Sequence, residues 1–218
     1  MINVVCFYWK GSDRPGWLNV PLARVYISKL QAGVARNLSL EHRFICFSNE
    51  GLKIDNVETR MFASPSYRGC LPKLSVFNPD NGLEGRVIML DLDIAITGNL
   101  DEMFSYTGEF MTREAFRFPG KSGGDIVFFE AGNQKGLWAV FRKNTKHFEN
   151  KLKARERLVY REYKPDGDFV QQKYPGQIFS YRRHIMKKGL PESCRIVTFH
   201  GKPRPHEVKD KWVMENWI

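Results

Sequence analysis

The chain has 218 residues, with 34 Lys and Arg against 24 Asp and Glu, which gives a formal net charge of +10. This length predicts one domain that buries a core without needing disulfides or metal ions for stability. Hydrophobic residues make up 42% of the chain and charged residues 27%, so wholesale disorder is excluded, and no apolar run is long enough to cross a membrane as a helix. The positive charge indicates an anionic partner: nucleic acid, a phospholipid surface or a phosphorylated small molecule.

The first part of the chain predicts strands that alternate with a helix. Residues 3–8 and 42–48 are continuous apolar runs, typical of strands covered on both faces, and residues 57–62 predict a further strand. Between the first two, residues 20–38 predict an amphipathic helix. The apolar stripe of this helix contains Leu22, Val25, Tyr26, Leu30, Val34 and Leu38.

The remaining elements continue the alternation. Residues 86–96 (RVIMLDLDIAI) predict the strongest strand, and residues 126–129 another. Residues 137–163 read as helical and basic, and residues 166–174 predict a short helix. A strand-like piece at 196–199 then precedes the sequence HGKPRPHE. This order predicts an open α/β sheet, in which ligands bind outside the carboxyl ends of the strands.

The four cysteines lie far apart, with no CxxC and no zinc-like spacing to histidine. They predict free thiols in a reducing compartment. They are Cys6, Cys46, Cys70 and Cys194.

Two carboxylates follow the apolar run that begins at Arg86. In a continuous strand, Asp91 and Asp93 would point to the same face. Carboxylates this close repel each other, so burying them requires a neutralising charge. Mg²⁺ or Mn²⁺ supplies such a charge and commonly shares carboxylates with substrate phosphates. We therefore favour a metal site over the alternative, a pair of aspartates that cap a turn.

The segment RVIMLDLDIAITGNLDEMF (86–104) resembles the D-x-D region of nucleotide-sugar glycosyltransferases of the GT-A fold, particularly those similar to glycosyltransferase family 8. The resemblance extends across most of the chain. Further segments that are similar to this family are PKLSVF (72–77), SGGDIVFF (122–129), PDGDFV (165–170) and FHGKP (199–203). His, Gly and Lys are contiguous in the last segment, whereas the family spaces them apart, so the metal-binding histidine is either His200 or His206.

The resemblance implies an α/β GT-A fold, an open mixed sheet flanked by helices, in a single domain over residues 1–218. Residues 1–104 would form the nucleotide-binding half, and residues 105–218 the acceptor half with a C-terminal extension. The implied enzyme is a hexosyltransferase that depends on Mn²⁺ (or Mg²⁺). It would move a sugar from a nucleotide-diphosphate donor, with a UDP-sugar favoured, to a glycan or lipid-linked acceptor, with retention of the anomeric configuration.

Specific residues carry these roles. A departing diphosphate needs positive charge, which a metal ion and lysine side chains provide. The metal ligands would be Asp91, Asp93 and His200. The donor-binding residues would be Tyr8, Trp9 and Lys10 (followed by Gly11) for the base, Asn49 for the base or ribose, and Lys73, Asp91, Gly201 and Lys202 for the diphosphate side.

On the acceptor side, Asp125 and Asp168 are the candidates that orient or deprotonate the acceptor hydroxyl. In a retaining mechanism the leaving phosphate takes the role of the base. Trp9 is as well explained by core packing as by contact with a base.

Two other functions stay open. One is a nucleotidylyltransferase of related fold, although the loop KGSDRPGW (10–17) lacks the repeated glycines of that class. The other is a basic nucleic-acid-binding protein without catalysis, for which we find no signature motif, so we expect no nucleic-acid partner. We expect a cytoplasmic location. Residues 142–164 form either a solvated helix face or a basic surface for peripheral contact with the inner face of the membrane.

Overall fold

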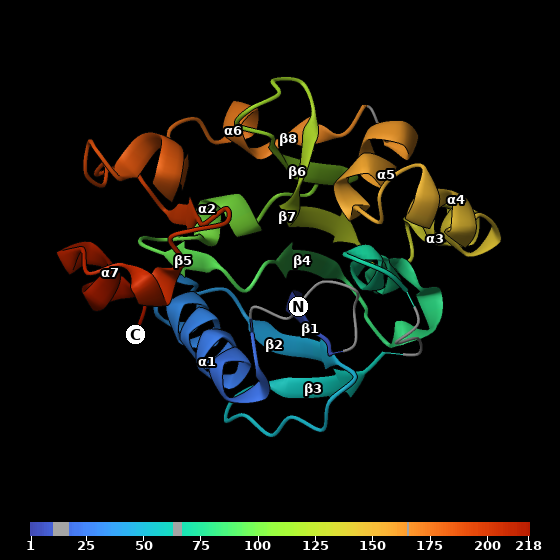
Figure 1. Cartoon of the computed structure of the whole chain (residues 1–218), viewed down its shortest axis with the longest axis horizontal. Coiled ribbons are helices and arrows are strands. Elements are labelled where there is room, and N and C mark those ends of the chain that lie inside the picture. Colours follow the sequence, from blue (N-terminus) through green and yellow to red (C-terminus); the bar gives the residue numbers. More distant parts are fainter. Residues whose placement is uncertain (11–17, 63–66, 165) are drawn as a thin grey trace.

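The computed structural model describes residues 1–10, 18–62, 67–164 and 166–218, and its centre is a seven-stranded mixed sheet (Figure 1). The order across this sheet is β3-β2-β1-β4-β7-β6-β8. Neighbouring strands from β3 to β4 are parallel, β7 is antiparallel to both β4 and β6, and β8 is parallel to β6. The bounds are β1 (Ile2–Tyr8), β2 (His42–Ser48), β3 (Glu58–Met61), β4 (Arg86–Leu90), β6 (Phe110–Glu114), β7 (Ser122–Glu130) and β8 (Asp168–Phe169).

Both faces of this sheet are covered, as the continuous apolar runs predict. In β1, Val4 and Cys6 belong to the core on one face, while Val5 and Phe7 belong to the core on the other. The other central strands alternate in the same way, because successive side chains of a strand point to opposite faces. All four of these β1 residues are buried.

One core lies between the large sheet and a second layer that contains α1, α2, α7 and a three-stranded sheet of order β5-β10-β9 (Figure 1). In α1, Gly33 lies against Ile96 of β5, so close that a methyl group on the glycine would be 3.3 Å from the Ile96 Cβ. The bounds in this layer are α1 (Val20–Asn37), β5 (Ile94–Ile96), α2 (Asp101–Phe104), α6 (Val170–Lys173), β9 (Ile178–Ser180), the π-helical turn η3 (Tyr181–Ile185), β10 (Ile196–Thr198), the 3₁₀ turn η4 (Pro205–Glu207) and α7 (Lys211–Asn216).

The opposite core is covered by a 3₁₀ helix and three short α-helices. Aromatic side chains fill it, with Phe141 and Phe148 fully buried. The bounds are η1 (Leu71–Phe77), followed by the 3₁₀ turn η2 (Pro79–Asn81), and then α3 (Lys135–Lys143), α4 (Thr145–Asn150) and α5 (Glu156–Tyr163).

The predicted strand over residues 86–96 is wrong in one important respect, because it is two strands in two different sheets. β4 pairs with β1 and β7, whereas β5 pairs with β10. Asp91 and Asp93 therefore lie in the turn between the strands and do not share a strand face.

Three other predicted elements differ from the structure. The helix expected over 137–163 is three helices, and Lys153 and Ala154 take positive φ values of 51° and 50° before α5. The helix expected over 166–174 is the short strand β8 followed by α6. Val25, placed on the buried stripe of α1, is 41% exposed, since α1 turns Ala23 and Ile27 inward instead.

The α/β fold expected from the sequence, an open mixed sheet flanked by helices, is confirmed. The division into a nucleotide-binding half and an acceptor half at residue 104 stays a prediction. Within the described ranges, none of the helices has both the length and the apolar character needed to span a bilayer.

The end of the chain is fastened to α1 by Trp217. Its ring meets the Tyr26 ring edge-on at 4.8 Å, and Lys29 Nζ lies 4.4 Å from the ring centroid. Lys29 also donates a hydrogen bond of 2.9 Å to the Trp217 carbonyl. We expect Trp217→Ala to lower the free energy of unfolding by about 3 kcal/mol, because a buried aromatic contact is replaced by a cavity.

Urea unfolding followed by circular dichroism measures this loss. Met214→Ala is the matched control, since Met214 lies in α7, the helix that ends directly before Trp217, and is 59% exposed. Equal stability of the two variants would contradict the assignment of Trp217 to the core.

Candidate active site

Charged side chains gather at one edge of the large sheet. The parallel strands β1, β2 and β4 end at this edge, and β7, which runs the opposite way, begins there. Asp91 follows the end of β4, and its backbone N–H donates a 2.8 Å hydrogen bond to the carbonyl of Asp125 in β7. The two aspartates are therefore neighbours, although 34 positions separate them in the sequence.

Lys73 links two of the carboxylates. Its ammonium donates to Asp91 and, at 3.0 Å, to Glu156 at the start of α5. Lys73 is only 7% exposed and Glu156 only 5%. Burial alone would lower the pKa of Lys73, but the charges of Asp91 and Glu156 outweigh it and raise the pKa well above its ordinary value. Lys73 therefore stays charged and holds the two carboxylates together.

Asp93 has a cation of its own. Arg204, from the segment HGKPRP, donates a hydrogen bond to its carboxylate. Burial together with the charge of Asp91 nevertheless raises the pKa of Asp93 to about 7, although Arg204 opposes the shift. Burial also raises the pKa of Asp91 to about 6, against the effect of Lys73. Lys73 and Arg204 thus supply too little positive charge to compensate fully the two carboxylates of the D-x-D segment.

Asp125 is held by Arg113 of β6, whose Nε donates a 2.5 Å hydrogen bond to Asp125 Oδ1. Burial would raise the pKa of Asp125, but Arg113 and His200 outweigh it and keep the pKa below its ordinary value. Asp125 is therefore ionised at neutral pH. Its second oxygen, Oδ2, is buried and has no hydrogen-bond partner among the residues that the structure describes.

The glycine pair of the SGGD segment makes room for these contacts. A Cβ atom on Gly124 would lie 2.3 Å from a carboxylate oxygen of Glu156, and one on Gly123 would lie 2.5 Å from the Arg113 guanidinium. Both distances are far below van der Waals contact. The absence of side chains at Gly123 and Gly124 therefore lets Glu156 and Arg113 approach β7.

His200 lies beside these residues, after the end of β10. Its Nε2 and the Thr198 hydroxyl are hydrogen-bonded at 2.8 Å, and its ring meets Phe116 edge-on at 5.6 Å. Burial lowers the pKa of His200, so the imidazole is uncharged at neutral pH, which is the form that binds metal ions.

A divalent cation fits the chemistry of Asp91 and Asp93, because these partly buried carboxylates are incompletely compensated by Lys73 and Arg204, and such ions are commonly held by one or two carboxylates plus substrate phosphates. In the described part of the chain, however, no three His, Cys, Asp or Glu side chains are grouped so that they could hold a metal ion. His200 as a third ligand stays a prediction.

The other residues of the sequence HGKPRPHE make different contacts. His206 Nδ1 is hydrogen-bonded to the Tyr26 hydroxyl of α1 at 2.5 Å. Gly201 has a φ of +76°, a left-handed conformation that favours glycine. The Lys202 side chain is 87% exposed and lies 3.7 Å from Glu207. Contact of Gly201 and Lys202 with a diphosphate stays a prediction.

The residues expected to hold the base lie at the ends of β1 and β2. Tyr8 is buried, with its hydroxyl 3.5 Å from the Leu18 carbonyl, and the Trp9 ring packs against the core of η1 and α3. Asn49 accepts a hydrogen bond from the Lys10 N–H (2.9 Å) and donates one to the Lys10 carbonyl (2.8 Å). Asn49 thus ties the two strand ends together, and Gly11 lies outside the described residues.

Asp168 is not brought to this cluster. It lines a separate cavity of about 310 Å³ and accepts a 2.6 Å hydrogen bond from the Tyr106 hydroxyl. Lys173 lies 3.3 Å from its other oxygen. The geometry therefore favours Asp125 over Asp168 as the residue near Asp91, and a catalytic role for Asp168 stays a prediction without support from its surroundings.

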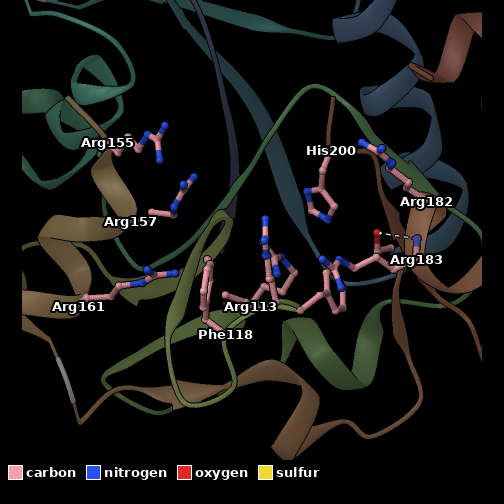
Figure 2. Close-up of a pocket in the computed structure, with 13 residues that line it drawn as sticks. Arg113, Phe118, Arg155, Arg157, Arg161, Arg182, Arg183 and His200 are labelled. Atoms are coloured by element: carbon pink, nitrogen blue, oxygen red, sulfur yellow. Dashed lines mark hydrogen bonds between the residues drawn. The ribbon is translucent and has the colours of Figure 1, made fainter. Parts of the chain in front are cut away.

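A larger cavity of about 710 Å³ adjoins Asp125 through Arg113, Gly123 and His200, and arginine side chains dominate its lining (Figure 2). Three of these arginines come from the basic stretch 142–164, so part of that stretch lines a concave site.

Sequence reasoning missed three residues of the site: Arg113, Glu156 and Arg204. Arg204 stood four residues after His200 in a motif already singled out, so its position was a usable signal. Arg113 and Glu156 carry no local signal, because they reach their partners from β6 and α5.

No protein-family model matches the sequence, and no curated protein matches it significantly. Solved structures do match. The structure of the glycosyltransferase GlyE of Streptococcus pneumoniae TIGR4 superposes with a TM-score of 0.68 at 14% identity, over 99% of this chain and 60% of that one. Its apo form gives a TM-score of 0.67 at 12% identity, with the same coverage.

A crystal structure of the galactosyltransferase LgtC in complex with donor and acceptor sugar analogs gives a TM-score of 0.61 at 8% identity, over 93% of this chain and 88% of that one. At these identities the similarity establishes a shared fold. This chain spans 60% of the length of the GlyE structures.

The ion pairs of Lys73 lead to a prediction about the free energy of unfolding. Lys73→Met leaves Asp91 and Glu156 buried without their cation, and we expect a loss of about 3–5 kcal/mol at neutral pH. The loss should be smaller at pH 5 than at pH 8. In the variant, one carboxylate of the folded state binds a proton more readily than the same group in the unfolded chain. The stability of the variant therefore falls as the pH rises.

Urea unfolding at the two pH values measures both effects. Lys164→Met is the matched control, since Lys164 pairs with the exposed Glu109, and it should cost less than about 1 kcal/mol. Adding Glu156→Gln to Lys73→Met should recover part of the loss. A variant that is as stable as the parent at pH 8 would show that the pairs do not matter for folding.

Proposed function

We propose that this chain is a glycosyltransferase that moves a hexose from a nucleotide-diphosphate sugar to an acceptor hydroxyl. The observation that carries the proposal is Asp125, an ionised and buried carboxylate whose Oδ2 has no hydrogen-bond partner among the described residues. Asp125 lies directly beside Asp91, at the edge of the sheet where the fold predicts ligand binding. The hydroxyl group of an acceptor substrate can donate a hydrogen bond to such an oxygen. The fold shared with solved glycosyltransferases supports the same reaction class.

In the proposed reaction the bond between the sugar C1 and the diphosphate oxygen breaks, and the nucleoside diphosphate leaves with the electron pair. A bond forms between C1 and the acceptor oxygen, whose proton goes to a base. In an inverting course Asp125 Oδ2 receives this proton. In a retaining course, which the resemblance to family 8 favours, the departing phosphate receives it and Asp125 orients the acceptor hydroxyl.

Asp91 and Asp93 would hold Mn²⁺ or Mg²⁺. The bound ion would stabilise the negative charge that develops on the leaving diphosphate. Lys73 keeps the Asp91 carboxylate in position, and Arg204 does the same for Asp93. Burial of these pairs strengthens their electrostatic effect on charge that develops nearby.

The finer parts of the proposal rest on the resemblance alone. They are membership of family 8, a UDP-sugar as donor, a glycan or lipid-linked acceptor, and action in the cytoplasm or at the inner face of the membrane.

The first experiment is a thermal-shift panel with UDP, GDP, CMP and their sugars, each with Mn²⁺ and with EDTA. We expect one nucleotide diphosphate to raise the melting temperature only with Mn²⁺, because a ligand that binds the folded state alone stabilises it. Asp91→Asn and Asp93→Asn should each abolish this shift while unfolding cooperatively without ligand. If no nucleotide gives a shift, the donor assignment fails, and nucleic-acid binding becomes the leading alternative.

Asp125→Asn tests the acceptor role separately. The amide keeps an oxygen for Arg113, so the fold should survive, but it accepts a proton poorly. We expect transfer to fall by a factor of about 10² or more, while Mn²⁺-dependent nucleotide binding changes less than twofold. The measurement is the release of nucleoside diphosphate with and without acceptor. Unchanged turnover in the variant would remove Asp125 from the mechanism.

A further inference from the structure

The cavity beside Asp125 is lined by seven arginines (Figure 2). Three arginines of α5 and its N-cap lie on one side, namely Arg155, Arg157 and Arg161, and Arg182 and Arg183 of η3 lie on the other. Arg113 lies between the two groups. No acidic residue is among the described residues that line this space.

Most of these cations lack a counter-ion among the residues that the structure describes. Arg113 is the exception, since it pairs with Asp125. Arg161 donates a 3.0 Å hydrogen bond to the Ser122 carbonyl, and both Arg117 and Arg161 approach the Phe118 ring, at 5.7 and 5.9 Å. Within the described ranges, six of the seven arginines form no ion pair with a carboxylate.

Folding alone does not account for this arrangement. Arg157 and Arg161 are four residues apart on α5, and like charges at this spacing destabilise a helix. Burial and the nearby charges of Arg157 and Arg113 lower the pKa of Arg161, which shows that the guanidinium groups repel one another. The helix is anchored by its opposite face, where Val159 and Tyr160 are fully buried. An anion bound at the arginine face would offset this repulsion.

Apart from His200, none of the residues expected on the donor side is among the described residues that line this cavity. The described lining residues fall between 113 and 200, and none of them lies at the ends of β1, β2 or β3. It reaches the reaction centre through Arg113 and Gly123, which flank Asp125, and through His200. A group bound here would approach Asp125 past Arg113, Gly123 and His200, and not past Tyr8 or Asn49.

We propose that this arginine cavity binds a phosphate group of the acceptor, so that the enzyme glycosylates a phosphate-bearing molecule at a hydroxyl near that phosphate. This inference rests on the proposed function and deepens it. Guanidinium groups match phosphate oxygens with paired hydrogen bonds, and several of them facing one another suit a ligand with more than one negative charge. A single carboxylate would offset one cation and leave the others in repulsion.

Two sources of the phosphate are distinguishable, a sugar phosphate and an isoprenyl diphosphate. Isothermal titration at 0.15 M salt would use glucose 6-phosphate and geranyl diphosphate as probes, with glucuronate and glucose as the carboxylate and neutral counterparts. The protein is first saturated with the nucleotide diphosphate and Mn²⁺ found in the thermal-shift panel, so that the donor site cannot take up the probe. We expect one phosphate probe to bind at least tenfold more tightly than glucose and glucuronate.

The double variant Arg157→Gln/Arg182→Gln removes one cation from each side of the cavity. We expect the double variant to bind the phosphate probe about tenfold more weakly or worse, since each lost charge-assisted hydrogen bond lowers the affinity by a large factor. Nucleotide binding should change less than twofold. The matched control is Arg24→Gln/Arg142→Gln, which removes the same charge from exposed positions outside the cavity and should leave both affinities within twofold.

Several results would overturn the proposal. One is equal affinity for glucose and both phosphate probes, with nucleotide binding intact. A second is tighter binding of glucuronate. A third is loss of nucleotide binding in the cavity variant, which would place the donor in the cavity. A fourth is a single-stranded oligonucleotide that outcompetes the probes and depends on the same arginines.

Failure of the proposed function would look different. In that case no nucleotide binds the parent protein, whatever the phosphate probes do. If the probes then bind in an arginine-dependent way, the cavity is a phosphate site, but its assignment to an acceptor is overturned together with the proposed function.

Discussion

Carboxylates buried at the end of a sheet require positive charge close by, and the residues of the candidate site are arranged around that requirement. Lys73 stands between Asp91 and Glu156, Arg113 holds Asp125, and Arg204 holds Asp93. These three cations come from three different parts of the chain, and Glu156 comes from a fourth, so the site exists only when η1, β6, α5 and the C-terminal segment are all in place. The pKa of Asp93, near 7, shows that the compensation is incomplete. This deficit is what a divalent cation would remove.

The same edge of the sheet shows two opposite uses of basic residues. Inside the carboxylate cluster each cation has a carboxylate partner, so its charge mainly stabilises that carboxylate. In the neighbouring cavity, six arginines have no carboxylate partner among the described residues, so their charge is available to a ligand. Arg113 belongs to both, because it contacts Asp125 and also lines the cavity. The net charge of +10 is thus not only a diffuse surface property; part of it is concentrated next to the proposed reaction centre.

Periodicity and apolar runs were sufficient to predict the strands β1 to β4 and β7 of the large sheet, but not β6 or β8. The strand 42–48 was predicted with its observed bounds, and α1 and the opening strand were predicted to within one residue. These elements are determined locally, because a run of apolar side chains has to be buried on both faces. The position of Asp91 after β4 was likewise readable, since polar residues that follow a buried strand lie at the sheet edge where ligands bind.

Contacts between distant segments decided the rest. The sequence by itself determined an α/β fold and the presence of two aspartates after a strand. It did not determine that the strand breaks there, because that break depends on β5 pairing with β10, about a hundred residues later. Glu156, Arg113 and the arginine cavity were equally hidden. Their charges look like an ordinary solvated surface in the sequence, and only the packing of α5, η3 and the β6–β7 hairpin brings them next to Asp125.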